Sequence, residues 1–145
     1  MDNIKKILIA VDEASTSEKV VLYGYNLAKQ LNAEVALISA VDTEFMITEG
    51  DITQDELAEM QEENLKQSHQ LLIYKIFNNR EITTFIKRGE PDEIIIKTAE
   101  EWNADLIILG THGRTGLSHL LIGSVAEEVI RHSTKPTLII PLNHD

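Results

Sequence analysis

The stretch Lys6–Val11 (KILIAV) decides the fold class of this chain, and Asp12 follows it directly. The stretch is apolar and rich in β-branched residues, without the alternation of polar residues that a strand with one solvent-facing side shows. Strands buried on both faces have this composition, and they belong to parallel sheets that helices cover on both sides. The stretch therefore predicts an α/β domain with a buried parallel strand near its amino terminus.

Helices and strands are predicted to alternate along the rest of the chain. Four more apolar runs predict strands, at Val35–Val41, Ile82–Ile86, Leu106–Leu109 and Thr137–Ile140. Apolar residues at helical spacing separate these runs, from the cap candidates Ser15–Ser17 to Asn32, from Thr53 to Ile76, from Pro91 to Trp102 and from Ser124 to Arg131. Two of these helices open with the spacing of a capping box, Thr53 with Glu56 and Ser124 with Glu127. The alternation predicts a single α/β domain over residues 1–145, with a mostly parallel sheet and helices on both faces.

Composition excludes several classes of function. The 145 residues include no cysteine, which rules out a disulfide framework, thiolate metal sites and a cysteine nucleophile. Asp and Glu number 24 against 13 Lys and Arg, and the net charge of -11 opposes binding to a phosphate backbone. Nowhere does an apolar stretch approach the roughly 18 residues of a membrane span. We expect a cytoplasmic protein with neither a nucleic-acid nor a membrane partner.

Ligands of open α/β sheets bind beyond the carboxyl ends of the strands, where the strand order reverses. The segments that follow the first, second and fourth predicted strands hold Asp12, Ala40–Asp42 and Gly110–Ser124. The last of these contains four of the seven glycines, and no acidic residue occurs from Gly110 to Ala126. A glycine-rich loop that leads into a helix presents convergent N–H groups, which suit phosphate. It is neither a P-loop nor the dinucleotide-binding G-x-G-x-x-G, but it predicts an anion site.

The glycine spacing carries a family resemblance. Gly110-x2-Gly113-x9-Gly123-Ser124 matches the G-x2-G-x9-G-[ST] signature of the ATP-binding universal stress proteins. The resemblance extends over nearly the whole chain, through ILIAVD, RGEPDEII, DLIILGTHGRTG, LLIGSVAEEVIR and KPTLIIP, and is weakest over Thr43–Asn79. It implies a five-stranded parallel sheet of order 3-2-1-4-5, with the switch point between the first and fourth strands.

The resemblance also implies a ligand, ATP or another adenine nucleotide, which could bind together with Mg²⁺. It implies that Asp12 lies beside the adenosine and that the backbone around Ala40 contacts adenine. Gly110 and Gly113 would let the loop close over ribose and phosphates, and Arg114 would face the phosphates. The full set of implied binding residues is Ala10, Val11, Asp12, Ala40, Val41, Leu109, Gly110, His112, Gly113, Arg114, Gly123, Ser124 and Val125.

Other interpretations of these residues stay open. Asp12 could be the N-cap of the first helix, and Ser124 a helix cap as well as a phosphate contact. Nothing in the sequence places a base beside a nucleophile, so we expect nucleotide binding with slow or no hydrolysis. The alternatives are a nucleotide hydrolase that uses the same pocket and, less favoured, a structural dimerisation domain. The last strand, Thr137–Ile140, would be an edge of the sheet, which predicts a homodimer formed through it.

Overall fold

The computed structural model describes residues 3–12, 14–43, 50–111 and 123–142, which form one parallel sheet and four helices. In chain order the elements are β1 (Lys6–Ala10), α1 (Ala14–Leu31), β2 (Glu34–Val41), α2 (Gln54–Phe77), β3 (Thr83–Arg88), α3 (Pro91–Trp102), β4 (Leu106–Gly110), α4 (Ser124–His132) and β5 (Thr137–Ile140). The strand order is β3-β2-β1-β4-β5, and every neighbouring pair is parallel. The predicted fold class and strand order are confirmed.

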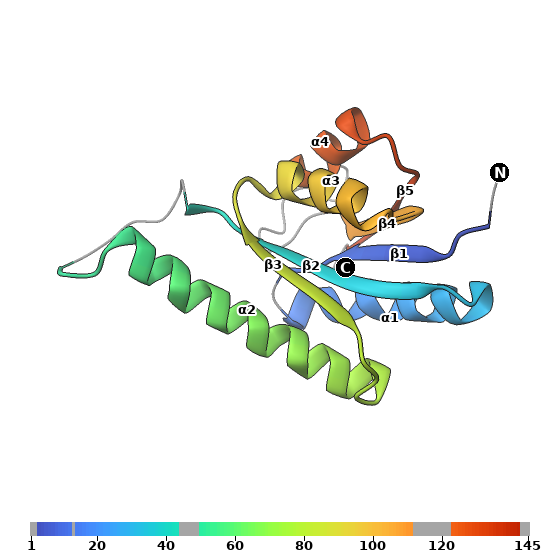
Figure 1. Cartoon of the computed structure of the whole chain (residues 1–145), viewed down its shortest axis with the longest axis horizontal. Coiled ribbons are helices and arrows are strands. Elements are labelled where there is room, and N and C mark those ends of the chain that lie inside the picture. Colours follow the sequence, from blue (N-terminus) through green and yellow to red (C-terminus); the bar gives the residue numbers. More distant parts are fainter. Residues whose placement is uncertain (1–2, 13, 44–49, 112–122, 143–145) are drawn as a thin grey trace.

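Helices cover both faces of the sheet, with α1 and α2 on one side and α3 and α4 on the other (Figure 1). The central strand β1 explains why its sequence does not alternate. Ile7 and Ile9 pack into the core under α1 and α2, while Leu8 packs into the core under α3 and α4, and all three are fully buried. Ile9 pairs with Leu37 of β2 on one side and with Ile108 of β4 on the other. Both faces of β1 are therefore core, as the sequence predicts.

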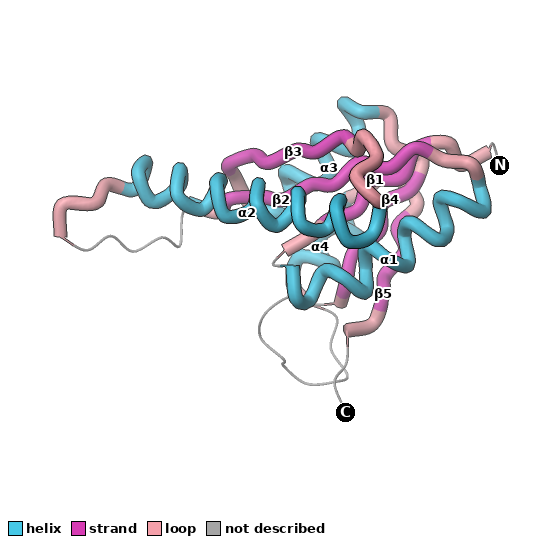
Figure 2. The backbone as a smooth tube through the Cα atoms, turned by 90° about the horizontal axis from the view of Figure 1, so that it is seen from below, coloured by secondary structure: helices cyan, strands magenta, loops and turns pink. Residues whose placement is uncertain are grey.

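Helix α2 runs along the sheet, and its first turns extend past the ends of β2 and β3 (Figure 2). Its start is the predicted capping box, because Thr53 Oγ1 accepts from the Glu56 amide at 3.0 Å and Glu56 Oε1 accepts from the Thr53 amide. Its end is Asn78, whose left-handed backbone closes the helix. None of the helices in the described ranges is long and apolar enough to cross a membrane.

The acidic amino-terminal half of α2 is tied to the sheet by one arginine. Arg88, the last residue of β3, donates from Nε to Glu62 Oε2 at 2.9 Å and from Nη1 to Asp55 Oδ1 at 2.6 Å. The hydrogen bond from Arg88 holds the pKa of Glu62 below its ordinary value. This part of the helix carries a solvated acidic face, and two of its carboxylates also anchor it to β3.

Candidate functional site

The carboxyl ends of β1 and β4 lie side by side at the centre of the sheet. From β1 the chain crosses to β2 on one side, whereas β4 lies on the other side, so this is the point where the strand order reverses. The described residues of the predicted site that lie at this edge are Ala10 at the end of β1 with Val11 and Asp12 after it, Ala40 and Val41 at the end of β2, and Leu109 and Gly110 at the end of β4. The topology therefore assembles three of the predicted segments at the switch point.

The first turn of α4 lies at the same edge. The Gly123 amide donates to the carbonyl of Thr111, which joins the start of α4 to the residue after β4. Thr111 also holds the chain after β5, because its amide donates to Ile140 O at 3.1 Å and its Oγ1 accepts from the Leu142 amide at 3.0 Å. Thr111 thus ties β4, β5 and α4 together beside the candidate site.

The predicted capping box at Ser124 is wrong. Gly123 is the N-cap, since its backbone is extended and its carbonyl accepts from the Glu127 amide at 2.9 Å, so Ser124 is already helical. The helix therefore starts one residue before the box could form, and no side chain of the described residues caps it. Ser124 and Val125 contribute amides to this first turn, and helix first-turn amides are suited to binding an anion. His112, Gly113 and Arg114, the other members of the predicted site, lie outside the described residues.

Two buried serines hold the peptide group that joins Val11 to Asp12. The Val11 carbonyl accepts from Ser39 Oγ at 2.7 Å, and the Asp12 amide donates to Ser17 Oγ at 2.8 Å. Ser17 was expected among the N-cap candidates of α1, but α1 begins at Ala14 and Ser17 reaches back to the Asp12 amide. The carbonyl and the amide N–H of this peptide group are both hydrogen-bonded, so the backbone that leads from β1 into Asp12 is held in place.

Next to Ser39 lies a buried histidine that is not among the predicted site residues. His69 Nε2 of α2 lies 2.7 Å from Ser39 Oγ, and both residues are almost inaccessible to solvent. A carbonyl oxygen can only accept, so the Ser39 hydroxyl donates to Val11 and must accept from an Nε2–H of His69. Burial lowers the pKa of His69 to about 4, and the ring is neutral near pH 7.

The pair brings an imidazole beside a hydroxyl, but it does not form a hydrolytic dyad. The Ser39 proton is directed to a carbonyl, so the imidazole is not positioned to take it. His69 Nδ1 has no partner among the described residues, whereas the base of a catalytic triad is oriented by a third group. One signal could have revealed this histidine. Leu65, His69 and Leu72 follow the helical spacing of the buried face, for which the sequence pattern considers apolar residues only.

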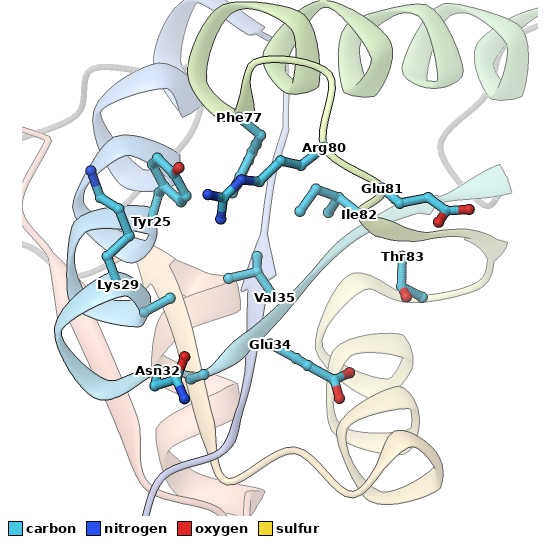
Figure 3. Close-up of a pocket in the computed structure, with 12 residues that line it drawn as sticks. Tyr25, Lys29, Asn32, Glu34, Val35, Phe77, Arg80, Glu81, Ile82 and Thr83 are labelled. Atoms are coloured by element: carbon cyan, nitrogen blue, oxygen red, sulfur yellow. The ribbon is translucent and has the colours of Figure 1, made fainter.

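A groove of about 490 Å³ opens at the opposite edge of the sheet, where α1 and α2 end and β2 and β3 begin (Figure 3). Lys29 and Arg80 lie near Tyr25 in this groove, with Lys29 Nζ 4.5 Å from the ring centre, while Glu34 and Glu81 point away from it. Two helix carboxyl ends carry negative partial charge, which these cations complement. The same partial charge opposes phosphate, so the groove is a poor anion site despite its two cations.

Comparison with known proteins identifies the family. Residues 3–141 match the model of the universal stress protein family. The chain belongs to that family. Among characterised sequences, universal stress proteins MJ0531 and MJ0577 of Methanocaldococcus jannaschii are 35% and 32% identical to it. Each alignment covers 94% of this chain, and they cover 81% and 94% of the two relatives respectively.

Solved structures of universal stress proteins share the fold. The structure of MJ0577 superimposes with a TM-score of 0.81 at 31% identity, over 99% of this chain and all of that one. A universal stress protein solved in complex with cAMP gives a TM-score of 0.68 at 19% identity, covering 97% and 99% of the two chains. One from Archaeoglobus fulgidus, in complex with dAMP, gives 0.60 at 20% identity, covering 96% and 99%.

Proposed function

We propose that this universal stress protein binds an adenine nucleotide, with ATP as the expected ligand, at the carboxyl edge of β1 and β4. One observation carries the proposal. The switch point of the sheet and the side-chain-uncapped first turn of α4 lie at the same edge, joined by the hydrogen bond from Gly123 to Thr111. A strand switch point favours the nucleoside, and convergent helix amides favour its phosphates. Because proteins of this fold have been solved with cAMP and with dAMP, the fold can accommodate adenine nucleotides.

Each segment has a role in the proposed complex. The Asp12 carboxylate would accept from a ribose hydroxyl, and the backbone of Ala40 and Val41 would contact adenine. The amides at the start of α4 would bind phosphate, together with Arg114 and the glycines of the acid-free run from 110 to 126. Phosphates bound in this way could carry a Mg²⁺ ion with them. Among the described residues, no three histidine or carboxylate side chains group to hold a metal by themselves.

We further propose that the protein acts as a nucleotide-loaded regulatory module and that it hydrolyses ATP slowly or not at all. The chain has no P-loop lysine, and the Ser39–His69 pair is buried with its proton directed to a carbonyl. A nucleotide hydrolase using the same pocket is the alternative. Single-turnover hydrolysis with Mg²⁺ at high protein concentration separates the two. A rate near the roughly 10 s⁻¹ of a median enzyme, lost in Asp12→Asn, would favour the hydrolase.

Calorimetry with AMP, ADP, ATP and adenosine tests the binding itself. At 100 times its dissociation constant, ATP should stabilise the fold by about 2.7 kcal/mol. Arg114→Ala should weaken ATP more than adenosine, because it removes only a phosphate contact. Gly113→Val should weaken both, since a β-branched side chain hinders close backbone approach. The absence of both heat and a melting shift with millimolar nucleotide would refute the proposal.

A homodimer formed through β5 is the proposed assembly. In the observed strand order β5 is an edge, and Thr137, Leu138 and Ile139 are only partly buried. Two copies that pair antiparallel along this edge would satisfy the free backbone groups of both. Pro136 and Pro141 flank the strand and lack amide donors, which would limit the pairing to this short segment.

A further inference from the structure

A chain of buried polar groups connects the middle of α2 with the residue that enters the proposed site. His69 Nε2–H donates to Ser39 Oγ, Ser39 donates to the Val11 carbonyl, and the next amide, that of Asp12, donates to Ser17. The exposed fractions of His69, Ser39 and Ser17 are 1%, 2% and 4%. The hydrogen bonds between these groups are 2.7 to 2.8 Å long. The three side chains of this series lie inside the core, and the series ends at Asp12, which is only partly buried.

The geometry fixes one peptide plane. The peptide group between Val11 and Asp12 is planar, so holding its oxygen and its N–H together sets the orientation of the whole plane. Ser39 holds the oxygen and Ser17 holds the N–H. The Val11 amide, in the preceding peptide, is held in turn by Ile38 O at 2.9 Å. That plane contains the Asp12 N–Cα bond, so it fixes the point from which the Asp12 side chain leaves the end of the strand.

We infer that Ser39, oriented by His69, is a positioning residue of the proposed nucleotide site, setting its affinity through the Val11–Asp12 peptide without touching the ligand. This inference rests on the proposed function and adds that nucleotide affinity depends on His69 of α2. His69 matters because its Nε2–H occupies the acceptor side of the Ser39 hydroxyl, which leaves the hydroxyl proton directed at Val11.

The surroundings argue against a role in stability alone. Ser39 stands between Leu37 and Val41 on one face of β2, and His69 lies between Leu65 and Leu72 on α2, all of them buried. Apolar side chains would fill such positions without the desolvation that two polar groups require. A buried polar pair at the centre of an apolar layer instead specifies one orientation of the group it binds.

Thr98 of α3 provides a matched control. It is as buried as His69, at 1%, but its Oγ1 has no hydrogen-bond partner among the described residues, and α3 lies on the other face of the sheet. Thr98→Val removes a buried hydroxyl and keeps a side chain of similar size. It leaves the hydrogen-bonded groups that lead to Asp12 unchanged.

The first experiment measures AMP and ATP affinity by calorimetry at a temperature where each variant is fully folded. Ser39→Ala should weaken binding by about threefold to tenfold, the equivalent of one hydrogen bond. His69→Leu should weaken it by a smaller factor, because Ser39 keeps its own donor. His69→Gln should restore the wild-type affinity, since its amide nitrogen can replace Nε2–H, and Thr98→Val should match the wild type. A purely structural role would lower the melting temperature of Ser39→Ala and leave its affinity unchanged, and that result would overturn the inference.

The second experiment needs no ligand. Amide hydrogen exchange by NMR should show that Ser39→Ala speeds exchange at Asp12 by about tenfold. The amide of Asp105, which donates to Lys6 O at the opposite edge of the sheet, should exchange as in the wild type. Equal changes at both amides would overturn the inference even if the wild type binds nucleotide. A wild-type protein that binds neither AMP nor ATP would instead overturn the proposed function, and the claim about affinity with it.

Discussion

The buried imidazole of His69 should make the stability of this protein depend on pH. Burial lowers the pKa of His69 from 6.5 to about 4, because the charged ring would lose its hydration. In the unfolded chain the same ring titrates near 6.5, so between these values the unfolded state binds more protons than the folded state. Above pH 6.5 the ring is neutral in both states and its lowered pKa costs no stability. As the pH falls from 6.5 toward 4, the unfolded state takes up the proton first, so the free energy of unfolding decreases progressively.

The size of the effect follows from the two pKa values. Each unit is worth 1.36 kcal/mol, so the full shift corresponds to about 3 kcal/mol, and lowering the pH from 7.5 to 5 should remove about 2 kcal/mol. His69→Gln keeps a donor for Ser39 Oγ but cannot take up this proton. The wild type should therefore lose about 2 kcal/mol more than the variant over this range.

Urea denaturation of both proteins at pH 7.5 and pH 5 measures this difference. The other four histidines are common to both proteins and cancel in the comparison. An equal loss of stability in wild type and variant would show that His69 is not held neutral in the folded protein. A larger loss in the variant would show that the sign of the shift is wrong.

Three further predictions concern the framework around the site. Gly110→Ala should destabilise the fold by about 1 to 3 kcal/mol, because its Cβ would overlap the Leu142 side chain, and adding Leu142→Ala should recover part of this loss in urea denaturation. Thr53→Ala should cost about 1 kcal/mol through loss of the capping box, whereas Thr53→Ser should stay near wild type in the same assay. Ile139→Lys should shift the mass measured by light scattering from dimer toward monomer, and a wild-type monomer at about 50 μM would contradict the proposed pairing through β5.

The sequence predicts the fold well because each strand and helix carries a local signal. The uninterrupted apolar run at Ile7–Ile9 reflects burial on both faces, and the Thr53 capping box needs only residues three apart. The end of β3 is predicted less well. Lys87 and Arg88 extend the strand beyond Ile86 because they pair with Ala40 and Val41, a contact that no local pattern carries.

The candidate site is predicted only in part, because only some of its residues carry a local signal in the sequence. The glycine spacing marks Gly110 and Gly123, and the strand order places their segments at one edge. The network behind Asp12 depends on Ser39 and His69, which are thirty residues apart and come from different elements. Serine in a strand and histidine in a helix have many roles, so only the packing of α2 on β2 reveals that they meet.

The pairing of β1 has a consequence for synthesis of the protein. One edge of β1 pairs with β2, the next strand in the chain, but its other edge pairs with β4. Ile7 can therefore pair with Leu106 only after β4 has been synthesised. At about 5 to 20 residues per second, the ribosome needs several seconds to make the chain between β2 and β4. Throughout that time the nascent chain exposes the open edge of an apolar strand, a template for unwanted pairing with other chains. Chaperone dependence should therefore be greatest during this interval and should fall once β4 has left the ribosome.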